Sequence, residues 1–556
     1  MKAKKILAGL LCVILLVASF AACGGEKGKE SSTGGGTSSP SVAEPDDGNT
    51  EESTEPEPAA VTDEPYEISI MSWHAEGGET KFYDAVKYAT DAYTALHPNI
   101  TFKYIAQPYD GYMEQLDTQF ISESAADIIY LQPHMTRQFT DRGALLGLNK
   151  YMNDKSPYSD AGSWVESFSG GDDSFLGSKT TNAAGEIMFV PMDSSSAFAM
   201  GQPFFYNKDL FEKAGITETP KTFDEFLDVL AKLKESGTVP IAADKDRFVS
   251  WSLGIIGEQM GERYMDQYFD DKYNGSDKKE LELDKIAVAL ANDEIKPEDQ
   301  IVNDIISLFY DYSQNWQDGW TGTALEEANK LFLMQEAAII QDGFWQYINY
   351  KELIGDDFAW DVFSIPVITK DYSEYAMEGF QKPTGLQDTG YSLNGALAKD
   401  EDRANVVIDF MRFLTSIDVQ QEYVKIAVTF SPTDGVTQPE ELQPFIMDNS
   451  LATHEQPFKA YFVDYSDVLW TEMIQEFATG KVDQATLLKN VIANSKEKAV
   501  EDCADKLDTL PQGIEDAEAE LEELKADNAS ELVIQSKEKS IELLKLKLEM
   551  YEQYVK

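Results

Sequence analysis

Aromatic, carboxylate and amide side chains recur just after short apolar segments that are typical of β-strands. A sugar ring has apolar faces and a rim of hydroxyl groups, so a site for one combines flat aromatic rings with carboxylate or amide groups. Ligands of α/β sheets lie outside the carboxyl ends of the strands, and the residues that follow each predicted strand are therefore the candidates. They are Trp73 and His74, Gln132 and His134, Asp193, Trp251, then Asp342, Phe344 and Trp345, then Asp388 and Tyr391 on either side of Gly390, with Trp316 and Trp320 around Asp318-Gly319.

Each candidate also has a structural interpretation. Tryptophans in a chain of this size lie in a core about as often as in a site, and His74 and His134 could be buried histidines with satisfied hydrogen bonds. Asp342 could cap a helix, and an aspartate in a turn, such as Asp388, is a common use of that residue. Both interpretations stay open at this point.

Catalytic motifs are missing from the sequence. It contains no GxSxG, HExxH or P-loop pattern, and it has only four histidines. Residues 311–315 alternate oxygen-bearing side chains like a calcium loop, but the loop's glycine at position six and glutamate at position twelve are absent. We therefore expect no cofactor and no metal. A glycosidase needs only two carboxylates, and 99 acidic residues leave that possibility open.

The elements that must position these side chains alternate between strand and helix. Alternating or continuous apolar strands are predicted at 66–73, 100–105 and 127–131, with helices at 80–96 and 112–121 between them. Such alternation predicts an α/β sheet built from βαβ units. Farther along, Thr222 and Glu225 form a predicted capping box at the start of a helix that ends at Gly237.

Five collinear segments resemble the family 1 extracellular solute-binding proteins of ABC importers, the maltose-binding-protein-like group. They are 205–216 (FYNKDLFEKAGI), 220–226 (PKTFDEF), 332–345 (FLMQEAAIIQDGFW), 410–423 and 470–482. The resemblance extends from about Tyr66 to about Glu497. It implies a type II-like periplasmic-binding-protein fold with two α/β lobes over 66–498, joined near 192–204, 360–380 and 430–440. It also implies a binding protein that is not an enzyme, with Trp345 stacking on the solute.

Three features depart from the family pattern. Gln335-Glu336 replace the usual Asn-Gly turn, residues 262–300 look like an acidic insertion, and the segment 499–556 lies outside the resemblance. Apolar residues in that last segment follow a 3-4 spacing that is interrupted at Asp527-Asn528, which predicts a C-terminal helical hairpin after Pro511. The hairpin either packs on its own lobe or offers a surface to a partner.

The N-terminus predicts export and a lipid anchor. Three lysines within residues 1–5 precede an apolar stretch over 6–20, and Ala21-Ala22-Cys23 resembles a bacterial lipobox. We expect a signal peptide at 1–22, acylation of Cys23 and a disordered acidic tether over 23–65. An ordinary signal peptide is the alternative; a membrane span is disfavoured because about 15 apolar residues fall short of the roughly 20 required. The predicted location is the outer face of the cell membrane, with a Gram-positive cell wall as the natural setting.

Composition limits the partners. The 46 basic and 99 acidic residues give a net charge of −53, which excludes nucleic acid and leaves the lipid anchor as the only expected membrane contact. Cys12 leaves with the signal peptide and Cys23 is acylated, so Cys503 has no cysteine with which to form a disulfide.

Together these features predict a monomeric, lipid-anchored solute-binding protein that captures a carbohydrate and delivers it to an ABC permease. The alternative is a surface glycan-binding or glycan-cleaving lipoprotein that serves no transporter.

Overall fold

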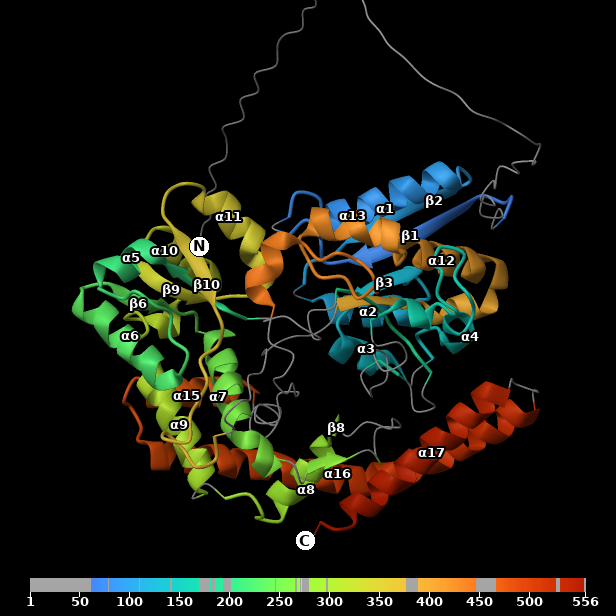
Figure 1. Cartoon of the computed structure of the whole chain (residues 1–556). Helices are drawn as coiled ribbons and strands as arrows, with labels where there is room; N and C mark the ends of the chain where they lie inside the picture. The colour runs from blue at the N-terminus through green and yellow to red at the C-terminus, as the bar shows by residue number, and fades with distance from the viewer. Residues whose placement is uncertain are drawn as a thin grey trace, which may run out of the picture. The chain divides into compact units, whose positions relative to one another are not determined.

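The computed structural model describes residues 62–78, 80–109, 111–140, 143–169, 180–181, 186–193, 202–245, 247–265, 268–270, 272, 280–296, 299–376, 389–446, 467–526 and 531–554. The predicted signal peptide, Cys23, nearly all of the tether and Asp388 lie outside the described residues. The chain folds into two α/β lobes, each built on one principal sheet (Figure 1).

The N-lobe contains a five-stranded sheet in the order β2-β1-β3-β11-β4. Its strands are β1 (Tyr66–Ser72), β2 (Ile100–Ala106), β3 (Ile128–Leu131), β4 (Val190–Asp193) and β11 (Thr389–Leu393). β1 runs parallel to β2 and β3, whereas β11 is antiparallel to β3 and β4. All four residues of β3 are buried, as expected for a strand covered on both faces of a sheet.

Helices cover both faces of this sheet. On one face α1 (Phe82–Leu96), α12 (Glu401–Leu414) and α13 (Ile417–Ala427) share a core with Ile68, Ile70 and Tyr130. On the other face α2 (Tyr112–Ile121) and α3 (Pro133–Thr140) pack with Met71 and Ile129. The short elements α4 (Asn149–Met152), η1 (Val165–Ser167) and η6 (Gly395–Lys399) complete the lobe. Since neighbouring strand residues face opposite layers, β1 supplies both cores at once.

The C-lobe contains a four-stranded sheet in the order β10-β5-β9-β6. Its strands are β5 (Phe204–Asn207), β6 (Val239–Ala242), β9 (Ala337–Gln341) and β10 (Trp360–Phe363), and only β6 and β9 pair in parallel. The surrounding helices are α5 (Lys208–Lys213), α6 (Phe223–Glu235), α7 (Arg247–Met265), α9 (Gln300–Ser313), α10 (Leu325–Leu333), α11 (Tyr347–Ile354) and α15 (Asp467–Ala478), with the 3-10 turns η4 (Trp320–Gly322), η5 (Phe344–Gln346) and η7 (Glu440–Phe445).

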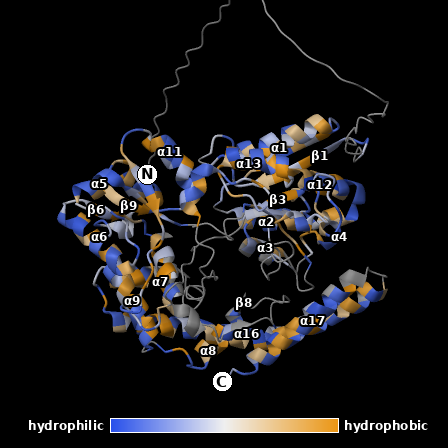
Figure 2. Cartoon of the chain, viewed as in Figure 1, coloured by the Kyte–Doolittle hydropathy of each residue, from blue (hydrophilic) through white to orange (hydrophobic). Residues whose placement is uncertain are grey.

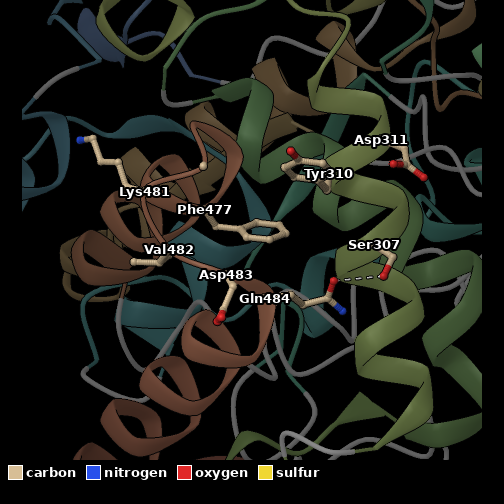
Figure 3. A pocket seen from close by; sticks show the side chains of 9 residues that line it. Ser307, Tyr310, Asp311, Phe477, Lys481, Val482, Asp483 and Gln484 are labelled. Carbon is tan, nitrogen blue, oxygen red and sulfur yellow. Dashed lines mark hydrogen bonds between the residues drawn. The ribbon is translucent and has the colours of Figure 1, made fainter.

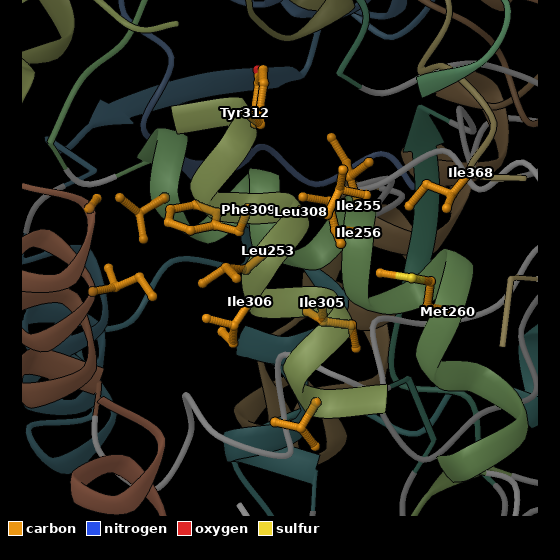
Figure 4. Close-up of a cluster of buried hydrophobic side chains, with 14 of the residues drawn as sticks. Leu253, Ile255, Ile256, Met260, Ile305, Ile306, Leu308, Phe309, Tyr312 and Ile368 are labelled. Carbon is orange, nitrogen blue, oxygen red and sulfur yellow. The ribbon is translucent and has the colours of Figure 1, made fainter. Parts of the chain in front are cut away.

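The largest hydrophobic core of the described residues lies in the C-lobe and includes the contact between α7 and α9. Figure 4 shows Leu253, Ile256 and Met260 of α7 facing Ile305 and Phe309 of α9, all of them buried. Hydrophobic residues likewise gather where helices meet sheets and other helices (Figure 2). The predicted capping box is confirmed at the start of α6: the Glu225 amide donates to Thr222 Oγ1 at 3.3 Å, and the Thr222 amide donates to Glu225 Oε2 at 3.2 Å.

Among the described elements, the chain passes from one lobe to the other after β4, after β10 and after α13. The third of these passages begins at Val428, whose φ of 49° and ψ of 60° lie in the left-handed region. A β-branched residue rarely adopts that conformation. Gln335 also has a positive φ, 61°, at the turn where the sequence departs from Asn-Gly.

The insertion and the C-terminal segment pack against each other. The insertion forms β7 (Phe269–Asp270), β8 (Glu280–Leu281) and α8 (Leu283–Ala291), and α8 lies against α16 (Gln484–Ala526) and α17 (Glu531–Tyr551). α16 begins at Gln484, before the predicted boundary at 499, and continues through Pro511 to Ala526, next to the predicted interruption at Asp527-Asn528. Its first half belongs to the C-lobe core, through Leu487, Val491 and Cys503.

The second half of α16 and most of α17 form a two-helix arm, which we define as residues 511–546. Its hydrophobic centre consists of Ala517, Leu521 and Ile541, and Lys537–Glu520 (2.5 Å) and Lys545–Glu518 (2.6 Å) connect its helices. At the base of the arm Lys547 lies 2.7 Å from Asp284, and Tyr551 enters the C-lobe core. The predicted hairpin is therefore present, and its base is built into the C-lobe.

No helix among the described residues is long and apolar enough to span a membrane. The same residues contain no cluster of three or more metal-ligating side chains.

Candidate functional site

Three parallel strands of the N-lobe end beside one another and bring four side chains together. Trp73 and His74 follow β1, Tyr109 follows β2 and Gln132 follows β3. The Trp73 and Tyr109 ring centroids lie 5.3 Å apart, edge to face, and the Tyr109 hydroxyl donates to Gln132 Oε1 at 3.4 Å. We call these four residues the N-lobe platform. Tyr109, which is 52% exposed, was not among the predicted residues, although the rule that selected the others would have found it.

Buried tyrosines hold the platform from behind. Trp73 packs edge to face on Tyr112 and Tyr130, with ring centroids 5.3 and 4.7 Å away. The Tyr112 hydroxyl in turn donates to the carbonyls of Tyr130 (3.0 Å) and Met71 (3.3 Å). Trp73 itself is only partly buried. A partly exposed indole backed by fixed rings suits stacking, because little side-chain freedom remains to be lost when a ligand covers it.

His74 is neutral at physiological pH in this setting. Its ring stacks on Phe82 with centroids 4.6 Å apart, and its Nδ1 lies 3.0 Å from Thr80 Oγ1. Burial disfavours the charged form and lowers the pKa of His74 to about 3. The neutral imidazole can therefore either donate or accept a hydrogen bond, and it adds no charge to the platform. The backbone of His134 lies in α3, but its side chain is outside the described residues.

In the C-lobe, Trp345 and Trp251 form an aromatic pair that corresponds to Trp73 and Tyr109 of the N-lobe platform. Trp345 lies in η5, which follows β9 after the turn at Asp342-Gly343, and Trp251 lies near the start of α7. The ring centroids of the two tryptophans are 6.5 Å apart at 88°. Both indoles are partly buried. The Trp345 ring covers Gly343 so closely that a Cβ there would lie 2.0 Å from it. The glycine before Phe344-Trp345 is thus required for this ring position, and we call the two tryptophans the C-lobe pair.

Asp342 fixes the turn that carries Trp345. The carboxylate is fully buried; its Oδ1 accepts from the Gly343 amide at 2.7 Å and its Oδ2 from the Tyr350 hydroxyl at 2.6 Å. This arrangement differs from the predicted solute contact, because the carboxylate is enclosed and both of its oxygens accept hydrogen bonds from the protein.

Three other predicted contacts are also enclosed. Trp320 is 6% exposed and packs edge to face on Trp316 in the C-lobe core, at 4.7 Å. Tyr391 is 1% exposed and packs on Tyr130. Asp193 is 6% exposed, and one of its oxygens accepts from Thr389 Oγ1 at 2.5 Å. Their aromatic faces and carboxylate oxygens are covered by protein groups, so the structure gives them supporting positions.

A separate hollow of about 500 Å³ lies between α9 and the turn from α15 to α16 (Figure 3). Tyr310 and Phe477 form its aromatic wall, with ring centroids 5.1 Å apart, and the Ser307 hydroxyl donates to Gln484 Oε1 at 3.2 Å across it. None of the predicted solute contacts lines this hollow. The aromatic groups described above are therefore the stronger candidates.

Comparison with known proteins places these features in a family. A sequence model of the family described as bacterial extracellular solute-binding protein matches residues 76–421. A putative binding protein of Brucella abortus is 32% identical over 170 residues, which is 31% of this chain and 36% of that relative's length. An uncharacterized ABC transporter extracellular-binding protein of Pyrococcus horikoshii is 26% identical over 176 residues, 32% of this chain and 37% of that protein.

Solved structures share the fold along nearly their whole length. A chitin oligosaccharide binding protein aligns with a TM-score of 0.55 and 18% identity, over 78% of this chain and 99% of its own. Apo RafE from Streptococcus pneumoniae aligns with a TM-score of 0.55 and 16% identity, over 79% and 99% of the two chains. The two-lobed architecture expected from the sequence is confirmed. With the family match covering more than half of its length, the chain belongs to the bacterial extracellular solute-binding proteins.

Proposed function

We propose that this protein captures a carbohydrate between its two lobes and presents it to an ABC permease. The observation that carries the proposal is that each lobe holds a pair of partly exposed aromatic rings in edge-to-face contact, in segments that follow its strands. Trp73 and Tyr109 form one set, and Trp251 and Trp345 form the other. Aromatic faces of this kind fit the apolar faces of sugar rings.

Similar proteins supply independent support for a sugar. Structures with the same fold are described as a chitin oligosaccharide binding protein, as RafE in complex with raffinose and as maltose-bound MalE3 of T. maritima. Their sequence identity to this chain is low, 16–18%, so their ligands define which probes to test and do not identify the solute.

Capture would proceed by burial of the sugar and by lobe closure. Covering Trp73 and Trp345 removes apolar surface from water, and Gln132 offers an amide to the hydroxyl rim. A ligand that contacts both lobes binds the closed arrangement more tightly than the open one, and this difference in affinity drives closure. No bond is made or broken, and the closed form would be the state that the permease recognises.

Replacing Trp345 with alanine should weaken carbohydrate binding by about 1–3 kcal/mol, because a stacking face is lost from a desolvated site. Isothermal titration calorimetry with maltose, raffinose and chitin oligosaccharides measures the effect. Trp360→Ala is the matched control, since Trp360 is also a partly buried C-lobe tryptophan that packs on the same core. If no probe binds the wild type, or if both variants bind a probe equally well, the proposed site is wrong.

We also propose that acylated Cys23 holds the protein at the outer face of the membrane. A serine at this position lacks the thiol that acylation requires, so Cys23→Ser should release the protein into the medium. Cell fractionation and immunoblotting test this. Cys12→Ser is the control, because Cys12 lies within the predicted signal peptide and its loss should leave the protein at the membrane. Membrane retention of the Cys23→Ser variant would contradict the anchor.

A further inference from the structure

The carboxylate of Asp193 lies where three segments that pass between the lobes meet the N-lobe. Asp193 is the last residue of β4, Thr389 is the first residue of β11, and Thr429 follows α13. Thr389 Oγ1 donates to Asp193 Oδ2 at 2.5 Å, and Thr429 Oγ1 donates to Oδ1 at 3.3 Å. One buried carboxylate thus binds hydroxyl groups from both of the other segments, which are 196 and 236 residues away along the chain.

The third of these segments begins in a strained conformation. Val428, directly before Thr429, has a positive φ of 49°. Strained backbone of this kind persists only where surrounding contacts hold it. The Thr429 side chain is fully buried and bonded to Asp193, which makes this hydrogen bond one of the contacts that hold the segment.

Tyr130 connects the same carboxylate to the N-lobe platform. Its ring lies 4.7 Å from Trp73 and 5.1 Å from His74, centroid to centroid. Its hydroxyl lies 3.4 Å from Asp193 Oδ2 and also contacts Thr389 Oγ1. Burial, and then the charge of Asp193, raise the pKa of Tyr130 far above its usual value, so the hydroxyl keeps its proton and remains a donor.

We propose that Asp193 is a positioning residue of the hinge, which fixes the three interlobe segments relative to one another and, through Tyr130, couples the N-lobe platform to lobe motion. The hinge role depends only on the described contacts. The coupling to a ligand rests on the function proposed above. The sequence predicts that Asp193 contacts the solute directly. The proposal instead gives Asp193 a role in setting the equilibrium between the open and closed arrangements of the lobes.

Electron–electron distance measurement between two spin labels tests the hinge role without any ligand. Leu96, on α1 of the N-lobe, and Leu353, on α11 of the C-lobe, are exposed and suit replacement by labelled cysteines. The background carries Cys12→Ser and Cys23→Ser, and the remaining cysteine, Cys503, is fully buried. Burial raises the pKa of the Cys503 thiol to about 11, so it reacts slowly with the label.

Thr429→Val removes one hydrogen bond to Asp193 with little change of shape, and Asp193→Asn removes the charge. Thr433→Val is the matched control, because Thr433 lies in the same segment, is buried and donates to the Thr415 carbonyl at 2.9 Å, away from Asp193. Loss of one net hydrogen bond should shift the equilibrium between lobe arrangements about fivefold. We expect altered distance distributions for Thr429→Val and Asp193→Asn, and the wild-type distribution for Thr433→Val.

Unchanged distributions in both hinge variants would overturn the proposal, and so would a lower melting temperature without any change in distance. The same labelled proteins are then titrated with maltose, raffinose and chitin oligosaccharides. If no sugar binds but the hinge variants alter the distances, the proposed function fails and the hinge role stands. If a sugar binds and closes every variant at the same sugar concentration as the wild type, Asp193 does not couple the N-lobe platform to lobe motion.

Discussion

Replacing Arg403 with methionine should lower the free energy of unfolding by about 3 kcal/mol, because it leaves a buried carboxylate without its cation. Arg403 Nε and Nη2 donate to the two oxygens of Asp127, each at 2.7 Å, in a bidentate pair. Asp127 is 7% exposed and also accepts from the amide and the hydroxyl of Ser69. The pair connects α12 to the residue just before β3, so its loss loosens the N-lobe sheet.

The effect should depend on pH in a defined direction. Burial alone would raise the pKa of Asp127, but the hydrogen bonds from Arg403 and Ser69 outweigh burial and lower it. Stability from a carboxylate with a lowered pKa is fully present above the unfolded value of about 4 and is lost as the pH falls through the folded value. The difference between wild type and variant should therefore shrink in acid.

Chemical denaturation at pH 7 and at decreasing pH measures both effects. Lys150→Met is the control. Lys150 of α4 forms an exposed ion pair at 3.6 Å with Glu401, which lies close to Arg403 on α12. Such surface pairs contribute about 0–1 kcal/mol. Equal losses in the two variants would show that Asp127 does not depend on Arg403.

Deleting residues 511–556 should destabilise the C-lobe by about 5 kcal/mol, since it removes two side chains from the C-lobe core and uncovers a carboxylate. Met550 and Tyr551 are 3% and 2% exposed within the C-lobe core. Asp284 accepts from Lys547 Nζ at 2.7 Å and from the Tyr551 hydroxyl at 2.5 Å. From sequence alone, the truncated chain is expected to fold and merely to melt at a lower temperature. Because Tyr551 packs in the C-lobe core, we expect a larger loss of stability than the sequence alone suggests.

An internal excision separates the base of the arm from its outer part. Removing residues 518–542 and closing the gap with a short Gly/Ser turn keeps Lys547, Met550 and Tyr551 while it deletes Leu521 and Ile541. This variant should unfold within about 1 kcal/mol of the wild type, because the excised part has only a small apolar centre. Sugar affinity should stay within a few-fold of wild type in both variants, since the platform and the C-lobe pair lie between Trp73 and Trp345. Equal destabilisation of the two variants would contradict the role of the base.

Sequence reasoning succeeded where the information is local. The apolar run at 128–131 predicts a buried strand, and Thr222 with Glu225 predicts a helix start, because each depends on neighbours within a few residues. Trp73 and Gln132 lie near each other because they follow parallel strands, whose ends must lie side by side.

It failed where the partner is distant in the chain. Nothing near Asp193 indicates that Thr389 and Thr429 will cover its carboxylate, and nothing near Asp284 points to Lys547. The sequence predicts a hairpin that begins after Pro511, and nothing in its pattern indicates that the preceding helix continues through this proline. In the structure its side chain is exposed, and packing on either side keeps α16 continuous. The insertion and the C-terminal segment pack against each other. The sequence of either segment alone therefore does not show which of its apolar residues are buried.

The continuity of α16 makes the arm a lever. The helix is fixed in the C-lobe core as far as Cys503 and continues without interruption to Ala526, a further distance of about 35 Å at 1.5 Å per residue. If the C-lobe turns about the proposed hinge on an axis across α16, each degree displaces the tip of the arm by on the order of 0.6 Å relative to Cys503, as a stiff helix of that length requires. A rotation of several degrees would thereby become a displacement of several ångströms at the far end of the arm.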